Sequence, residues 1–285
     1  MAERRAVGDG SPPIRYALRV AALGYLGLLV ALPVGLVLFR AFEGGVGPAW
    51  EALTRPAALH ALRLTATIAL IAVPLNAAFG VLVALALARH EFRGKAAVSA
   101  LIDLPLGVSP VVVGLALIIV YGRTGWFGGW LLDHGVRVIF ATPGMILATL
   151  FVSIPFVARE VVPVLREIGT EQEEAASTLG ASDWQTFRLV TLPAIRPAIA
   201  FGVVLTTARA LGEYGAVSIV SGKLSGRTET LTLHVEERFQ AFDLVGAYAA
   251  SVALAAMALA TLGAMHLMRR RGGAGAGADA SGNGG

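Results

Sequence analysis

The sequence predicts an all-α fold, a polytopic bundle of about six membrane-spanning helices, from three observations. Hydrophobic residues make up 56% of the 285 residues and charged residues only 15%, whereas soluble domains are about one quarter charged. The apolar residues gather in runs of about 20 or more, which is the length of helix that crosses a bilayer. These runs lack the strict alternation that is typical of membrane β-strands.

Six apolar runs are long enough to span a membrane. They are Tyr16 to Phe39, Ala61 to Ala88, Ala97 to Tyr121, Val136 to Ala158, Ala194 to Val220 and Val245 to Met268. The first run exceeds the short apolar core of a signal peptide, so we expect it to be retained. We expect residues 1–15 to be a disordered cytoplasmic segment, residues 16–268 the transmembrane domain, and the Gly/Ala-rich residues 269–285 a disordered cytoplasmic tail.

Lysine and arginine are distributed unevenly between the two ends of these spans. Fourteen lie before the first span, between the second and third, around the connection of the fourth and fifth, or after the last, and eight lie in the other connections. Because positive residues accumulate on the cytoplasmic side of membrane proteins, we expect both termini in the cytoplasm. The connection between the fourth and fifth spans, residues 167–193 and hereafter the elbow, is expected there too.

The elbow has a helical pattern of its own. Thr170 with Glu173, and Ser182 with Gln185, each fit a capping box, in which two side chains satisfy the first free amides of a helix. Gly180 supplies the left-handed conformation that ends many helices. The elbow is therefore predicted to contain two short helices bent at Gly180. Because isolated helices below about 12 to 15 residues are marginal in water, we expect packing to hold them.

Two surroundings suit such an elbow, the lipid headgroups or a groove in another protein. Helices that lie on anionic lipid are usually rich in lysine and arginine. The first elbow helix is instead acidic, with Glu167, Glu171, Glu173 and Glu174 close together, which favours a protein partner. Pro193 marks the next helix break, before the fifth span.

The elbow resembles the "EAA" loop of ABC importer permeases. Glu174-Ala175-Ala176 is followed four positions later by Gly180 and then by a Val-x-Leu-Pro ending, with valine where isoleucine is more usual. In that family the loop is the coupling helix that seats in the ATPase subunit. The resemblance implies an ATPase-coupling role for Glu173, Glu174, Ala175, Ala176, Gly180, Val190, Leu192 and Pro193.

Two further stretches narrow the resemblance. "YGRTGWFGGWLLDHGVRVIFATPGMILATLFVSIPFVARE" and "ARALGEYGAVSIVSGKLSGRTETLTLHVEERF" are similar to the sulfate/thiosulfate permeases, more to the CysW than to the CysT member of that pair. The likeness runs from about Leu62 to Leu267. It implies a permease subunit that forms half of an alternating-access pathway in an ATP-driven sulfate/thiosulfate importer. The implied partners are an ATPase of the CysA kind, a second permease of the CysT kind and an extracytoplasmic sulfate/thiosulfate-binding protein.

Other functions are less well supported by the sequence. The molybdate/tungstate permeases, similar but shorter, are one alternative, and a self-contained channel or secondary transporter is another, although no internal repeat is evident. The chain has no GxxxxGK[ST] loop, so we expect ATP hydrolysis on a partner chain rather than an enzyme here. Without cysteine, and with five scattered histidines, neither a metal nor a cofactor is expected.

Charge within a span costs roughly 2.5 to 3.5 kcal/mol or more at mid-bilayer, so Arg209 and Glu213 stand out. They are four residues apart and share a helix face. Either they neutralise each other or reach the outer interface, or Arg209 helps to attract and pass a dianion. In the second case the nearby hydroxyls, those of Thr206, Thr207 and Ser218, would also face the pathway.

The stretch "DLPLGVSP", which begins at Asp103, interrupts the third span. Such breaks usually line a cavity or join a neighbouring helix, because lipid cannot satisfy the freed backbone groups. Ser109 and Pro110 are therefore candidates for a pathway or gate, with helix packing as the alternative. Asn76, beside Pro74, is expected to hydrogen-bond to another helix rather than to bind a ligand.

Overall fold

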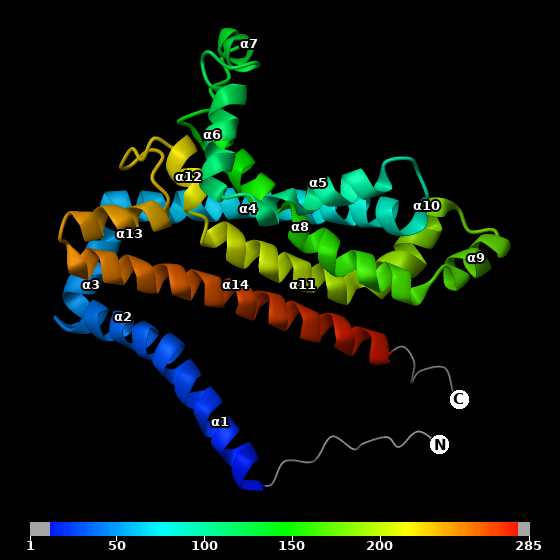
Figure 1. Ribbon diagram of the computed structural model, residues 1–285, viewed down its shortest axis with the longest axis horizontal. Coiled ribbons are helices and arrows are strands. Elements are labelled where there is room, and N and C mark those ends of the chain that lie inside the picture. The colour runs from blue at the N-terminus through cyan, green and yellow to red at the C-terminus, as the bar shows by residue number, and fades with distance from the viewer. Residues whose placement is uncertain (1–11, 279–285) are drawn as a thin grey trace.

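The chain folds around long helices that run side by side (Figure 1). The computed structural model describes residues 12–278, with side chains for 16–263, and within that range it contains helices and no strands. The long helices of the bundle are α4 (Pro56–Arg89), α8 (Thr142–Ile168), α11 (Leu192–Leu211) and α14 (Leu244–Ala278). The predicted all-α, polytopic architecture is therefore confirmed.

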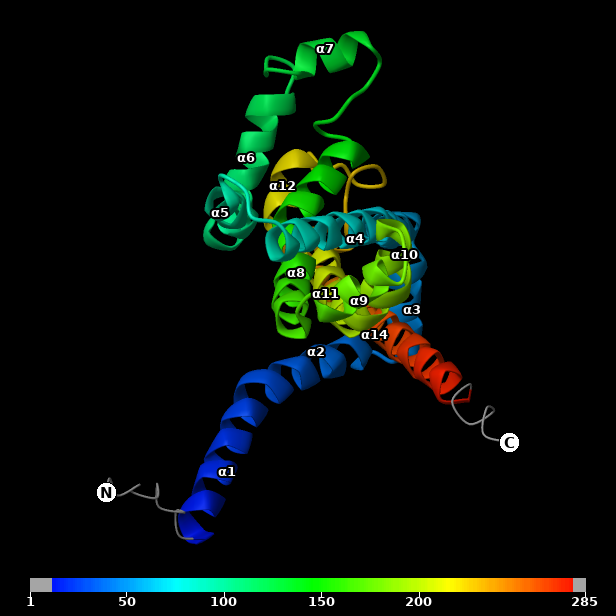
Figure 2. The same ribbon diagram turned by 90° about the vertical axis from the view of Figure 1, so that its right-hand side faces the viewer.

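The first span stands away from the bundle (Figure 2). It consists of α1 (Pro12–Leu26), a π-helical turn η1 (Gly27–Ala31) and α2 (Leu32–Phe42). Its most apolar window is 0% buried, so this span presents its side chains to its surroundings along the whole window. α2 meets the bundle along α14 and leads into the short α3 (Val46–Thr54).

The third predicted span is broken in two. α5 (Lys95–Gly107) and α6 (Pro110–Tyr121) meet at 113°, and α6 leads away from the bundle to α7 (Gly128–Asp133) (Figure 2). Ser109 is extended (φ −59°, ψ 132°), as expected of a residue that precedes a proline. Counting this pair as one span gives up to six spans among the described residues, and counting unbroken helices gives five.

Several predicted boundaries differ from the observed ones. The fourth span begins at Thr142 rather than Val136, and it ends at Ile168 rather than Ala158 because Val161 and Leu165 beyond that point are still buried in the bundle. α1 begins at Pro12 and α14 continues to Ala278, so the backbone is helical over residues 12–15 and 269–278, where disorder was expected. The rest of those segments, residues 1–11 and 279–285, lie outside the described residues.

α8 is the centre of the bundle. Its Val157 is fully buried between two glycines: a Cβ on Gly80 of α4 would lie 2.7 Å from Val157 Cβ, and one on Gly202 of α11 would lie 2.8 Å from Val157 Cα. Asn76 of α4 donates to Ser153 Oγ of α8 at 2.9 Å, which confirms the predicted interhelical hydrogen bond. Small residues and one polar bond therefore bring three spans into close contact.

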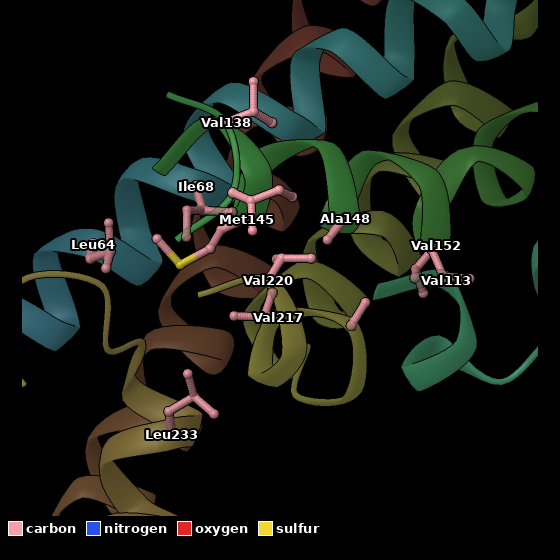
Figure 3. Close-up of a cluster of buried hydrophobic side chains, with 12 residues drawn as sticks. Leu64, Ile68, Val113, Val138, Met145, Ala148, Val152, Val217, Val220 and Leu233 are labelled. Carbon is pink, nitrogen blue, oxygen red and sulfur yellow. The ribbon is translucent and has the colours of Figure 1, made fainter. Parts of the chain in front are cut away.

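A second cluster of buried side chains lies where the broken spans meet the bundle (Figure 3). It joins residues from α4, α6, α8, the short α12 (Gly215–Val220) and α13 (Leu231–Gln240). The labelled members are Leu64, Ile68, Val113, Val138, Met145, Ala148, Val152, Val217, Val220 and Leu233.

Candidate functional site

The elbow lies at one end of the bundle, with α3 and α13 at the other (Figure 1). It contains α9 (Glu171–Thr178), α10 (Asp183–Thr186) and a π-helical turn η2 (Phe187–Thr191) that continues into α11. The predicted helix break at Pro193 is wrong, because α10, η2 and α11 form one continuous helical stretch. The wide π turn ends at Thr191, two residues before Pro193, which has no backbone N–H to donate.

The turn between α9 and α10 depends on Gly180. Its φ is +88°, and the amides of Gly180 and Ala181 donate to the carbonyls of Ser177 and Ala176, each at 3.0 Å. This pair of bonds is a Schellman motif, so the predicted left-handed turn is confirmed. A Cβ at Gly180 would meet nothing within 4 Å, which means that the position requires glycine for its backbone conformation and not for space.

One predicted capping box forms and the other does not. Ser182 N donates to Gln185 Oε1 at 2.8 Å, and Gln185 N donates to Ser182 Oγ at 3.4 Å. Thr170 makes no cap bond, and its hydroxyl donates instead to Glu174 Oε1 at 2.7 Å. The predicted Thr170/Glu173 capping box is therefore wrong. Glu173 turns towards the bundle instead, because the Arg89 guanidinium there gives its carboxylate a stronger, charge-assisted hydrogen bond than a backbone amide would.

The predicted coupling residues divide between an outer and an inner side of the elbow. Glu174, Ala175, Gly180 and Pro193 are exposed, whereas Glu173, Ala176, Val190 and Leu192 are half-buried. The elbow also exposes large apolar side chains outside the predicted set, among them Leu179 at 89%, Leu189 at 71% and Trp184 at 66%. Exposed apolar side chains beside acidic ones suit a groove in a protein better than water.

Glu173 faces α4. Arg89, the last residue of α4, donates through Nη2 to Glu173 Oε1 at 3.1 Å, and its Nε lies 2.9 Å from Glu173 Oε2. Thr191 Oγ1 donates to the same Oε1 at 2.7 Å. These contacts occupy the Glu173 carboxylate from the inner side of the elbow.

The two broken spans meet near the other end of the bundle. α11 ends at Leu211 and α12 begins at Gly215, where a Cβ would lie 2.9 Å from Pro110 Cβ at the start of α6. One turn further on, a Cβ on Gly114 would lie 2.7 Å from Ile219 Cβ. The fifth predicted span, Ala194 to Val220, is therefore wrong as one continuous helix, because α11 stops at Leu211. The structure brings this unpredicted break against the predicted break of the third span, with Pro110 packed at the junction and Ser109 exposed beside it.

Arg209 and Glu213 form an ion pair at this junction. Arg209 Nη2 lies 2.9 Å from Glu213 Oε2, and the side chains are 33% and 1% exposed. Glu213 Oε1 accepts a bond from Ala216 N at 2.9 Å, in the first turn of α12. The buried carboxylate is therefore matched by a guanidinium and an amide, while part of the guanidinium still faces open space.

The three hydroxyls predicted near the pathway already donate their only proton. Thr206, Thr207 and Ser218 bond to the carbonyls of Gly202, Val203 and Gly215 at 2.7 to 2.8 Å. An oxyanion accepts hydrogen bonds, so any of these hydroxyls would have to release its helix carbonyl to bind one. Arg209 is the better-placed donor of the group.

The sequence pattern did not reveal a cluster around α13. Glu229, His234 and Glu237 each offer one potential metal-ligand atom, and these atoms lie within 4.8 Å of one another. Burial raises the pKa of the Glu229 carboxyl, but hydrogen bonds with His234, Glu237 and Ser225 outweigh it, so that pKa is below its ordinary value. The neighbouring Glu229 raises the pKa of Glu237. The cluster lies close to Arg238, whose Nη2 is 3.2 Å from Glu237 Oε2.

Comparison with known proteins agrees with this geometry. Residues 54–271 match the family described as "Binding-protein-dependent transport system inner membrane component". "Sulfate transport system permease protein CysW" of Synechocystis is 47% identical, covering 90% of this chain and 94% of its own. "Sulfate transport system permease protein CysT" of Escherichia coli is 39% identical, covering 84% of this chain and 86% of its own.

The fold is also found in a solved structure of a bacterial ABC transporter involved in the import of the acidic polysaccharide alginate. The two superpose with a TM-score of 0.76 at 20% sequence identity, over 90% of this chain and 95% of that one. The resemblance in structure therefore extends over nearly the whole chain.

Replacing Gly180 with alanine is expected to weaken the elbow turn, because left-handed backbone costs an L-residue about 1–2 kcal/mol. Asparagine adopts left-handed backbone more readily than alanine, so the turn in Gly180→Asn should be more stable than in Gly180→Ala and less stable than in the native chain. Hydrogen exchange at the amides of residues 180 and 181 measures the turn directly. Equal protection in the native chain and in Gly180→Ala would show that the glycine is not what holds it.

Proposed function

Because this chain belongs to the family of binding-protein-dependent transport system inner membrane components, we propose that it forms half of the translocation pathway for sulfate and thiosulfate. It is a multi-pass membrane protein and a permease subunit of an ABC importer. The observation that carries the choice of substrate is the high identity to sulfate permeases over most of both chains. Tetrahedral oxyanions of similar size, such as molybdate and tungstate, are the competing substrates.

The elbow supports a coupling role. Its outer side presents Glu174, Ala175 and the exposed Leu179 and Trp184 for contact, on two short helices fixed by a Schellman turn and a capping box. The chain itself carries no phosphate-binding loop, so the proposed motor is an ATPase on a separate subunit. Closure of the ATPase pair would displace the elbow, and the bundle would rock between outward-open and inward-open states.

The orientation proposed from the basic residues fits the arrangement of the helices. α14 ends on the same side as the elbow, and Arg89, Arg93 and Lys95 lie close to that end of α4 (Figure 1). This end would face the cytoplasm and the ATPase. The opposite end, with α3 and α13, would face an extracytoplasmic binding protein, and a second permease would complete the pathway.

The junction of the broken spans is the proposed gate. It lies where α6 packs against α12 through Pro110 on Gly215 and Gly114 on Ile219, two contacts that a change in the angle of either span would alter. Arg209 would attract the dianion, and Glu213 would keep the guanidinium oriented. Thr206, Thr207 and Ser218 would supply hydroxyls only in states where their present bonds are released, and the exposed Ser109 would offer a further hydroxyl.

ATP-dependent sulfate uptake is the direct test of the proposed function. Vesicles that contain the permease with its ATPase, second permease and binding protein should take up labelled sulfate and thiosulfate only when ATP is present. Uptake of molybdate in preference to sulfate would move the assignment to the alternative substrates. Uptake by this chain alone, without ATP, would instead show a self-contained channel or transporter.

Substitutions on the outer side of the elbow should release the ATPase. Leu179→Asp and Trp184→Asp place charges in the proposed apolar contact, where burying an unpaired charge is costly. We expect the ATPase to be lost when either variant is purified from solubilised membranes. Phe242→Asp is the matched control, because Phe242 is 88% exposed at the other end of the bundle and its substitution should leave the ATPase bound.

Reversal of charge at Arg209 should block transport. Arg209→Glu leaves Glu213 buried without a cation, and we expect uptake to fall by at least about tenfold in complexes of normal yield. Arg40→Glu is the control, because it breaks an exposed ion pair with Glu43 outside the bundle. Normal uptake by an assembled Arg209→Glu complex would remove this residue from the proposed pathway.

A further inference from the structure

Arg89 binds two other parts of the chain at the base of the elbow, and its partner Glu173 binds a third. Besides its two contacts with Glu173 on α9, its Nη1 donates to the Leu165 carbonyl of α8 at 2.7 Å. Thr191 of η2, which is buried, donates to the same carboxylate. One guanidinium and one carboxylate therefore connect α4 with the end of α8 and with both ends of the elbow.

The positions of these charges match the helix ends that they touch. Leu165 lies in the last turn of α8, where carbonyls lack an intrahelical partner and a cation is favourable. Glu173 lies in the first turn of α9, where an anion is favourable. The two side chains are only 11% and 21% exposed, so water screens this pair much less than a surface ion pair.

α4 extends from this contact to the far end of the bundle. Along the way Asn76 and Gly80 hold it against α8, and near its other end Thr65 Oγ1 accepts a bond from Leu231 N of α13 at 2.8 Å. The elbow is covalently joined only to α8 and α11. Through Arg89 it also has a firm contact with a third span that reaches the opposite side.

We propose that Arg89 and Glu173 are a positioning pair that carries the displacement of the elbow to α4. This inference rests on the proposed coupling of the elbow to an ATPase. With the pair intact, the elbow moves as a unit with α4, α8 and α11. Without it, the elbow would remain docked on the ATPase but could swing about Gly169, which has a φ of +65° and whose Cβ position is open.

The test is the ratio of sulfate taken up to ATP hydrolysed in the reconstituted full complex. Arg89→Gln and Glu173→Gln should each lower this ratio about fivefold or more, with complex yield and ATP hydrolysis retained. Because the two residues act together, the double variant should be no worse than either single one. Arg89→Lys keeps the charge but loses the planar fork that reaches both Glu173 and Leu165. This variant should fold normally and give a ratio between those of the native complex and Arg89→Gln.

Glu91→Gln is the matched control. Glu91 lies in the connection after α4, where its Oε1 pairs with Lys95 Nζ at 2.6 Å, and its side chain is 89% exposed. Because this ion pair does not involve the elbow, its loss should leave the ratio of uptake to ATP hydrolysis unchanged. An unchanged ratio in all Arg89 and Glu173 variants would overturn the proposal. So would loss of the ATPase from Glu173→Gln complexes, which would place Glu173 in the docking surface. Failure of the native complex to couple ATP to sulfate uptake would instead count against the proposed function itself.

Discussion

The close approach of neighbouring helices to α8 is the constraint on which the rest of the bundle depends. Lipid tails are as apolar as leucine, so helices in a membrane gain little from burying apolar surface against each other and rely on tight contact instead. Gly80 and Gly202 provide that contact because they have no Cβ, which would clash with Val157 on either side. Gly114 repeats the arrangement where α6 meets Ile219 of α12. Glycines, which have no side chain, thus fix both the contact of three helices around Val157 and the junction of the broken spans.

The second consequence of the membrane is that every interruption of a helix needs its own partners. Glu213 meets this need at the break between α11 and α12, since it accepts the Ala216 amide while Arg209 balances its charge. The carbonyl of Glu213 accepts a further bond from Thr232 of α13. The carboxylate and the backbone groups at this break are therefore already bound, and the exposed part of the Arg209 guanidinium is the polar surface that remains there.

Much of the fold could be predicted from the sequence, because span length, cap residues and glycine turns are local signals. Gly180 and the Ser182 cap behave as the local pattern indicates, and Asn76 bonds across helices as expected. The predictions fail where a residue that is distant in sequence determines the local structure. Glu173 has the spacing for a cap but turns to Arg89, which is far away in sequence. The fifth predicted span breaks after Leu211, where the following helix α12 packs against Pro110 of another span. The α13 cluster likewise joins residues that no metal-binding spacing would have selected.

The way in which the elbow is held has a bearing on how such permeases diversify. The turn at Gly180 and the cap at Ser182 are made by residues of the elbow alone, so its shape can be inherited as a module. Its attachment is not self-contained in this way, because the carboxylate of Glu173 needs a guanidinium supplied by another helix. An elbow transferred between relatives would thus keep its form and, under the proposed coupling, its fit to an ATPase, yet it would be anchored to α4 only in a host whose second long span ends in a suitable cation.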